Sequence, residues 1–282
     1  MSIRLLANLR APRHLSLAYH AVDPHWPGSP GLGLSVPPDV FAAQLHDLAR
    51  RGYRGVTFSE AVLGDHPDHI VSITFDDAYC SVLEYALPPL RALGWPATVF
   101  APTANVASGR PMTWLGEGYA ERKRPLTWAE LSVLAAEGWE IGSHGRTHRL
   151  LSSLDDAELE DELAGSRADI ADHLGSCTSI AYPWGEVTDR VVEAARRAGY
   201  ATGSGLWGRV VYDDPLRVPR QAISAFDGQR RMALKTSRLY WALRSSGLWD
   251  ALDRARGLDG HRDVSVSRTL RARVQAILAL LR

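Results

Sequence analysis

The most restrictive feature of this 282-residue sequence is a series of short apolar runs that alternate with segments of helical periodicity. The run at residues 70–75 is rich in β-branched residues and predicts a buried strand, whereas residues 155–174 carry apolar side chains at helical spacing. We expect further strands at residues 15–19, 97–101, 139–142, 179–182 and 201–203, and further helices at residues 40–51, 82–93, 127–137 and 187–198. Such alternation is typical of an α/β fold built on a parallel sheet.

Local signals predict the ends of two helices and the position of one loop. Thr127 and Glu130 have the spacing of a capping box, which predicts a helix that begins after Thr127. Gly175 directly follows the helix predicted at residues 155–174 and is a suitable stop for it. The Pro- and Gly-rich residues 24–38 are expected to form a loop.

The charges divide the chain into two parts. The formal net charge is zero, but residues 229–282 carry twelve Lys or Arg against four Asp or Glu, so residues 1–228 carry the opposite excess. The length suits one catalytic domain with an extension. We therefore expect a catalytic domain over residues 1–228 and a basic helical extension, containing Trp and Leu, over residues 229–282.

Features of secreted or membrane-spanning proteins are weak in this sequence. Cys80 and Cys177 lie far apart, so we expect two buried thiols rather than a disulfide framework or a CxxC metal site. Asn8, Arg10 and Arg13 interrupt the apolar N-terminal residues, and no run of about 18 apolar residues occurs. We expect a cytoplasmic protein without a signal peptide or a transmembrane segment.

Reactive side chains follow three of the predicted strands, at the strand ends where parallel α/β folds gather their active sites. The first segment is TFDDAY, residues 74–79, with the adjacent carboxylates Asp76 and Asp77. Two adjacent carboxylates at the end of an apolar strand repel each other, and a bound cation would relieve that repulsion. The alternative is that one carboxylate caps the next helix and the other is solvated.

The second segment is SHGRTH, residues 143–148. His144 and His148 are four residues apart, so a helical turn or a tight loop can bring both imidazoles to one side. Two imidazoles and one carboxylate leave an open position for water, which is the arrangement of catalytic zinc sites. Thr147 is expected to hydrogen-bond within the loop. An HxxxH pair by itself also occurs without a metal.

The third segment is AYPWGE, residues 181–186, in which Pro183 and Gly185 predict a turn directly after a strand. The backbone N–H groups of such a turn can point into a cleft and form an oxyanion hole. An ordinary strand-to-helix loop is the alternative.

Together, the three segments resemble the motifs of the polysaccharide deacetylase family, carbohydrate esterase family 4. The family patterns TFDDG, H(S/T)xxH and (F/A)YPYG are matched, in this order, by TFDDA, SHGRTH and AYPWG. The segment LAYHAV at residues 17–22 is similar to the N-terminal strand of one branch of the family. The resemblance spans residues 15–223 and implies an α/β fold of the distorted (β/α) barrel type, followed here by a C-terminal helical extension.

The resemblance also implies roles for individual residues. Asp76 matches the catalytic base of the family. Asp77, His144 and His148 match the three ligands of one divalent metal ion, for which we expect zinc, with nickel, cobalt or manganese as alternatives. The backbone N–H of Trp184 matches an oxyanion donor.

Contacts with the substrate are expected from His20, Tyr182, Pro183 and Trp184. In the mechanism that the resemblance implies, the metal polarises the acyl carbonyl and lowers the pKa of its bound water, which is the nucleophile. Asp76 removes a proton as that water attacks.

Three of the departures from the family patterns affect protonation and substrate choice. Ala78 replaces the Gly of TFDDG, the Arg that orients the base in the RxPY form of the third motif has no equivalent near residues 179–182, and no LxH motif with a general-acid His follows Gly203. Arg220 is expected to enter the site instead and to stabilise negative charge or hold a substrate group, because Arg does not donate its proton near neutral pH. Asp76 would then return its proton to the leaving amine.

Residues 229–282 lie beyond the resemblance. Their last part predicts an amphipathic helix with an apolar face of Leu270, Val274, Ile277, Leu278 and Leu281. We interpret this helix first as packing on the catalytic domain or on a second subunit, and second as a contact with an anionic membrane surface or a partner protein. Nucleic acid is not an expected partner, because the body of the chain is acidic and has no recognition motif.

We expect a metal-dependent enzyme that hydrolyses a carbon–nitrogen bond, removing an N-acetyl or similar acyl group from an amino sugar or a related small molecule. Two alternatives use the same fold. One is an amidase or imidase that acts on a non-sugar bond, since related enzymes of the superfamily act on ureides. The other is a binding protein that has lost turnover, which the missing LxH motif suggests.

Overall fold

The computed structural model describes residues 15–24, 33–66, 69–112, 124–206, 213–244 and 246. Its strands are β1 (Leu15–Tyr19), β2 (Ala21–Val22), β3 (Ser35–Val36), β4 (Arg54–Val56), β5 (Ile70–Phe75), β6 (Thr98–Ala101), β7 (Glu140–Ser143), β8 (Ser179–Ala181), β9 (Thr202–Gly205), β10 (Val218–Pro219) and β11 (Gln221–Ala222). Its α-helices are α2 (Pro38–Arg50), α3 (Phe58–Leu63), α4 (Leu87–Ala92), α5 (Thr103–Ser108), α6 (Trp128–Ala136), α7 (Asp156–Glu160), α8 (Ser166–Leu174), α9 (Asp189–Arg197), α10 (Gln229–Lys235) and α11 (Arg238–Arg244). The π-helical turns η1 (Val82–Ala86) and η4 (Asp161–Gly165) and the 3-10 turns η3 (Leu151–Ser153), η5 (Pro183–Gly185) and η6 (Pro215–Arg217) complete the elements.

The main sheet follows the order β10-β9-β8-β7-β6-β5-β1-β11, with β4 paired to β5, and its pairings are parallel. Strand β5 pairs with β1 over Val71 to Phe75, with β4 near its beginning and with β6 at its end. At Gly55 of β4, an added Cβ atom would come within 2.4 Å of the side chain of Trp95. Gly55 therefore leaves room for the Trp95 ring. Along β5, the pairing partner changes from β4 to β6.

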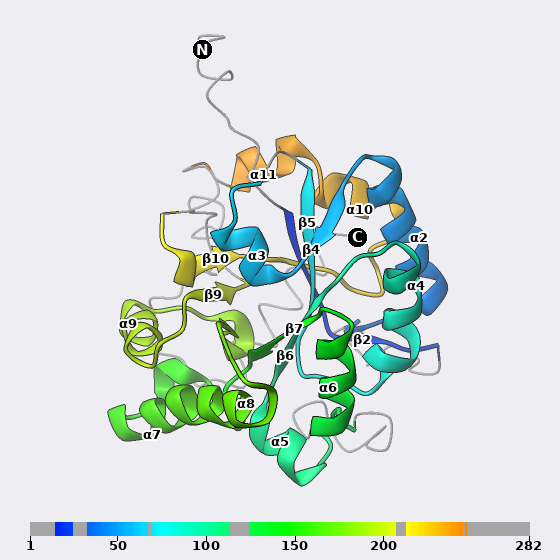
Figure 1. Cartoon of the computed structure of the whole chain (residues 1–282). Coiled ribbons are helices and arrows are strands. Elements are labelled where there is room, and N and C mark those ends of the chain that lie inside the picture. The colour runs from blue at the N-terminus through cyan, green and yellow to red at the C-terminus, as the bar shows by residue number, and fades with distance from the viewer. Residues whose placement is uncertain are drawn as a thin grey trace.

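The sheet curves into a nearly closed barrel with the helices around its outside (Figure 1). The closure is made by a single short segment, because β10 pairs with β9 while β11, which begins two residues after β10 ends, pairs with β1. Arg220 stands between these two strands, and its backbone N–H donates to the carbonyl of Gly205 at 3.1 Å. The expected α/β fold of the distorted (β/α) barrel type is confirmed.

Several predicted elements agree with the structure and others do not. Strands β1 and β5 have the predicted bounds, α6 begins after the Thr127 and Glu130 capping box, and Gly175 ends α8 with a left-handed φ of 88°. Strand β4 and helix α3 were not predicted, because β4 is only three residues long and contains an Arg and a Gly. The loop predicted at residues 24–38 contains the short strand β3, which pairs with β2.

Two helices that were predicted as continuous are interrupted by π-helical turns. The helix predicted at residues 82–93 consists of η1 and α4, and α4 has proline in its first turn. Proline has no backbone N–H to donate, so the α-helical bonding pattern does not run through it. The helix predicted at residues 155–174 consists of α7, η4 and α8.

The hydrophobic core lies between the barrel strands and the helices that cover them. Aromatic rings of Tyr19, Phe41 and Phe75 contact one another with centroids 5.1 to 5.8 Å apart, which ties α2 to β1 and β5. Both cysteines are free thiols. Cys177 is buried as predicted, but Cys80 is only partly buried, which corrects the expectation for that residue.

Helices α10 and α11 pack against the barrel, and α10 lies beside α2 (Figure 1). Trp241 of α11 is 1% exposed. Arg51 donates to the Thr236 hydroxyl at 2.7 Å, and Arg244 donates from Nη1 to the carbonyl of Arg220 at 3.1 Å. The described part of the C-terminal extension is therefore built into the structure that closes the barrel.

Among the described residues, no helix combines the length and the apolar character that crossing a membrane requires. The amphipathic helix predicted from Leu270 to Leu281 and the N-terminal residues 1–14 lie outside the described residues. The boundary between residues 228 and 229 and the cytoplasmic location stay predictions.

Candidate active site

Asp76 and Asp77 follow β5 and are each 1% exposed. The backbone N–H of Asp76 donates to the carbonyl of Tyr19 at 2.9 Å, which continues the pairing of β5 with β1. Asp77 and Ala78 then have left-handed φ angles of 70° and 52°, so the chain turns sharply. The turn gives the two carboxylates different neighbours, because Asp76 pairs with Arg220 while Asp77 faces two histidines.

Asp77, His144 and His148 form a single buried cluster. His144 follows β7 directly, and His148 lies in the loop after it with a left-handed φ of 57°. Oδ1 of Asp77 lies 3.7 Å from Nε2 of His144 and 3.3 Å from Nε2 of His148. One ligand atom from each residue lies within 4.8 Å of the others. The 3.3 Å separation matches the roughly 3–3.5 Å expected between ligand atoms about 2 Å from one zinc ion, and the wider separations require the side chains to move closer together when an ion binds.

Hydrogen bonding and burial favour the neutral form of the two imidazoles. Nδ1 of His144 donates to the carbonyl of Ala181 at 2.7 Å, so Nδ1 carries the proton and Nε2 presents its lone pair toward Asp77. Burial lowers the pKa of His144 and lowers the pKa of His148 well below its usual range. Both rings are therefore neutral near pH 7, which is the form that binds a metal.

Asp76 is held by a buried guanidinium. Arg220, which is 0% exposed, donates from Nη1 and Nη2 to the two carboxylate oxygens of Asp76 at 2.6 and 2.9 Å. The same guanidinium donates to the hydroxyls of Thr74 at 2.7 Å and Ser204 at 2.8 Å, and it lies 4.9 Å from the ring centroid of Phe100. Burial by itself raises the pKa of Asp76, but the charge of Arg220, the neighbouring imidazoles and these hydrogen bonds lower it to about 2.

This geometry changes the expectation for Arg220. We expected its guanidinium to stabilise developing charge or to hold a substrate group, but its donors are directed to Asp76, Thr74 and Ser204. Arg220 therefore orients the carboxylate of Asp76. The Arg missing near residues 179–182 has a counterpart that comes from the segment closing the barrel.

His20 lies at the end of β1, next to Asp76. The register pairs Tyr19 with Phe75, so His20 and Asp76 follow their strands at the same level. Nδ1 of His20 is buried and has no hydrogen-bond partner among the described residues. Burial lowers the pKa of His20 to about 4, although the charge of Asp76 acts in the opposite direction. His20 is therefore a neutral, polar group beside the candidate base.

The turn after β8 contacts the cluster through Trp184. Trp184 has a left-handed φ of 64°, its indole N–H donates to the carbonyl of His148 at 3.2 Å, and its ring packs edge-on against His148. Tyr182 is different, because its side chain is buried and its hydroxyl donates to the carbonyl of Leu216 at 2.9 Å. Pro183 beside it is also buried. The substrate contacts expected from Tyr182 and Pro183 stay predictions.

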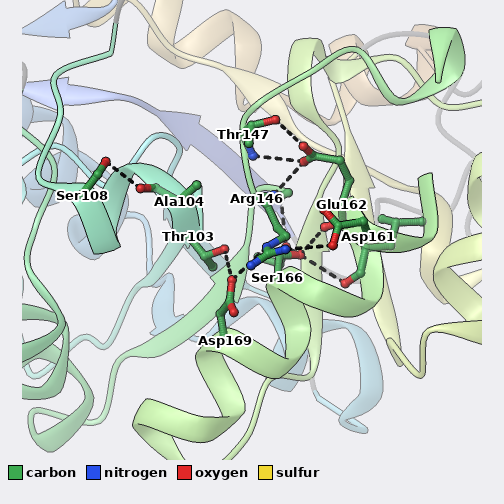
Figure 2. Close-up of polar contacts among 12 residues, drawn as sticks. Thr103, Ala104, Ser108, Arg146, Thr147, Asp161, Glu162, Ser166 and Asp169 are labelled. Carbon is green, nitrogen blue, oxygen red and sulfur yellow. Dashed lines mark hydrogen bonds and ion pairs between the residues drawn. The ribbon is translucent and has the colours of Figure 1, made fainter. Parts of the chain in front are cut away.

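The sequence did not identify two residues that support this site. Glu162, which is 3% exposed, accepts hydrogen bonds from the loop between His144 and His148 (Figure 2). Arg244 supports the backbone of Arg220. Glu162 lies among several acidic residues of a helical pattern, and Arg244 is one of many Arg in the basic tail, so neither has a local signal. Thr147, expected to bond within its own loop, bonds to Glu162 instead.

The fold is a parallel (β/α) barrel. An Asp-His-His cluster and an Arg-bound carboxylate lie together at the ends of its strands, where such barrels carry their active sites. The family model for polysaccharide deacetylases matches residues 63–203, half of the chain. The chain belongs to the polysaccharide deacetylase family. His20, Arg220 and Arg244 lie outside the matched residues.

Individual relatives agree with this assignment. YxkH of Bacillus subtilis (strain 168), a polysaccharide deacetylase by its name, is 29% identical over 194 residues, which cover 66% of this chain and 62% of YxkH. The match therefore spans less than two thirds of that relative.

Two solved structures share the fold. BA0330 of Bacillus anthracis has a TM-score of 0.66 and 22% identity, covering 79% of this chain and 69% of BA0330. The deacetylase PplD of Streptococcus pyogenes, determined in complex with acetate, has a TM-score of 0.68 and 21% identity, covering 79% of this chain and 97% of PplD.

Proposed function

We propose that this protein is a divalent-metal-dependent hydrolase that removes an N-acetyl or similar acyl group from an amino sugar or a glycan-related substrate. The observation that carries the proposal is the buried cluster of Asp77, His144 and His148 next to Asp76, which is ionised and held by Arg220. Membership of the polysaccharide deacetylase family and the name of YxkH support the substrate class.

Asp77, His144 and His148 would hold the metal ion. One carboxylate and two neutral imidazoles suit zinc and leave a coordination position open, with nickel, cobalt and manganese as alternatives. When bound, the ion would polarise the acyl carbonyl and lower the pKa of a water molecule. The Nδ1 bond of His144 to Ala181 keeps the coordinating nitrogen of this ring directed at the site.

Asp76 would act as the general base. The pKa of about 2 keeps its carboxylate ionised at neutral pH, and the two bonds from Arg220 fix the orientation of its oxygens. A carboxyl group with a low pKa releases a captured proton readily. We therefore assign to Asp76 the return of that proton to the leaving amine, which removes the need for a separate LxH histidine.

The remaining residues would bind and orient the acyl group. His20 lies beside Asp76, and Trp184 lies against His148, so both residues border the site. The backbone N–H of Trp184 would donate to the oxygen that gains negative charge. Pro183 would shape the same turn.

A zinc titration tests the metal centre. We expect metal-free wild-type protein to bind one zinc ion per chain in calorimetry, and we expect His148→Ala to weaken that affinity by orders of magnitude because it removes one of three ligands. An N-acetylglucosamine oligosaccharide and a small non-sugar amide would then be assayed side by side. Absence of zinc binding in the wild type would overturn the proposal. Turnover of the non-sugar amide alone would indicate that the protein is an amidase rather than a sugar deacetylase.

A further inference from the structure

Glu162 of η4 contacts the loop that joins the two histidines of the cluster. Its Oε2 atom accepts the backbone N–H groups of Arg146 at 2.7 Å and Thr147 at 3.1 Å, and its Oε1 atom accepts the Thr147 hydroxyl (Figure 2). All three donors lie between His144 and His148 in the sequence. The carboxylate therefore binds the ligand loop as a unit.

The loop provides the polar partners that a buried carboxylate requires. Glu162 is 3% exposed, and a carboxylate at that depth is costly unless it accepts several hydrogen bonds. The nearby guanidinium of Arg146 is directed elsewhere, to Asp161 at 2.8 Å and to Asp169 at 3.2 Å (Figure 2). The described hydrogen bonds of the Glu162 carboxylate are thus to the backbone and hydroxyl donors of the loop.

Glu162 lies in the π-helical turn η4, between α7 and α8. Turn η4 interrupts the path from α7 to α8, and such turns accompany functional sites in many helices. Ser166, the first residue of α8, donates to the carbonyl of Glu162 at 2.6 Å and shares a hydrogen bond of 2.7 Å with the Ser143 hydroxyl. Because Ser143 immediately precedes His144, the turn is attached to the strand that carries the first histidine.

The loop also approaches Glu162 closely at Gly145. Gly145 has a left-handed φ of 72°, and an added Cβ atom would lie 2.8 Å from Oε2 of Glu162. On its other side, the loop accepts hydrogen bonds from Thr103 and Ala104 of α5 at 3.2 and 2.8 Å. The loop is therefore held between α5 and η4.

We propose that Glu162 is a positioning residue that sets the metal affinity of the site by holding the His144–His148 loop in its ligating conformation. This inference rests on the proposed metal centre. The described hydrogen bonds of the Glu162 carboxylate go to Arg146 and Thr147, so Glu162 acts through these two residues.

The test compares zinc affinity in Glu162→Ala and Glu162→Gln by calorimetry. We expect Glu162→Ala to lose about 10- to 100-fold in affinity, which is typical when a group supporting a metal ligand is removed. We expect Glu162→Gln to remain close to the wild type, because the amide oxygen can accept both backbone N–H groups while the NH₂ group donates to the Thr147 hydroxyl. Recovery in Glu162→Gln is a result that a role of charge alone would not produce.

Further variants keep the outcome interpretable. Glu160→Ala removes an exposed carboxylate two residues away and is expected to bind zinc as the wild type does. If Glu162→Ala fails to fold by circular dichroism, Thr147→Val replaces it and is expected to weaken zinc binding several-fold. Unchanged affinity in Glu162→Ala, or in Thr147→Val when that variant replaces it, would overturn the inference, and so would equal losses in Glu162→Ala and Glu162→Gln. Absence of zinc binding in the wild type would instead contradict the proposed function.

Discussion

The two halves of the active site are supported in different ways. The base Asp76 is held by Arg220, which is 144 residues away in the sequence and lies outside the segment that matches the family model. The histidine loop is held by Glu162, only 15 residues from Thr147 and inside that segment. One half depends on a buried ion pair across the barrel, and the other depends on hydrogen bonds between neighbouring segments.

Because of this difference, a variant can lose turnover and metal affinity separately. Disturbing the ion pair changes the protonation and orientation of Asp76 but leaves the three metal ligands in place. Disturbing the bonds of Glu162 changes the ligand loop but leaves the contact of Asp76 with Arg220 intact. We therefore expect substitutions of Asp76 or Arg220 to lower turnover and substitutions of Glu162 to lower metal affinity.

The largest effect is expected from Asp76→Asn. Loss of the general base should lower kcat by about 10²- to 10⁴-fold, because an amide does not accept the proton of the attacking water. Zinc affinity by calorimetry should remain within a few-fold of the wild type, since Asp76 is not a member of the ligand cluster. Loss of zinc binding in Asp76→Asn would show that the two halves of the site are not separable.

Arg220→Met should have the next largest effect and should act through pH. Removing one partner of a buried ion pair destabilises a protein by about 3–5 kcal/mol. In the wild type, the pKa of Asp76 is about 2 and lies below its unfolded value, so this group stabilises the fold above about pH 4 and that contribution is lost as the pH falls toward 2. Without Arg220, burial dominates and the pKa of Asp76 rises, so the acid limb of the kcat profile should move to higher pH.

Urea unfolding at several pH values, together with a pH profile of turnover, measures both consequences of Arg220→Met. Urea titrations of the wild type should show a contribution from Asp76 that disappears between about pH 4 and pH 2, and the variant should lack it. An acid limb at the same pH in both proteins would indicate that Arg220 does not control the protonation of Asp76.

The smallest effect is expected from Arg244→Met. This change removes hydrogen bonds to the carbonyls of Arg220 and Leu206 at 3.1 and 2.9 Å and should lower the free energy of unfolding by about 1–3 kcal/mol. Turnover should fall several-fold while zinc affinity is unchanged, because the segment that carries Arg220 loses support. Arg230→Met, an exposed change of equal charge in α10, is the control and should alter neither quantity.

Sequence reasoning succeeded where the signal is local. The bounds of β1 and β5, the capping box at Thr127 and the end of α8 at Gly175 depend on neighbouring residues, and the structure confirms them. The clustering of Asp77 with the two histidines follows from short motifs placed at the ends of parallel strands. Such strand ends meet at one edge of a sheet.

Contacts between distant segments were not predictable in the same way. The pairing of Arg220 with Asp76 requires the barrel to close at residues 218–222, and no periodicity in those residues indicates it. The π-helical turns were missed because their side-chain pattern resembles that of an ordinary helix.

The sequence by itself determined the fold class, the order of the strands and helices around the motifs, and the residue types that can bind a metal. Only the tertiary structure decided which groups support them: Arg220 for Asp76, Glu162 for the histidine loop and Arg244 for the closing segment. The physical reason is the distance along the chain over which each kind of interaction acts. Strand and helix signals arise from the next few residues along the chain. The partner of a buried charge can lie on any segment that the closed barrel places next to it.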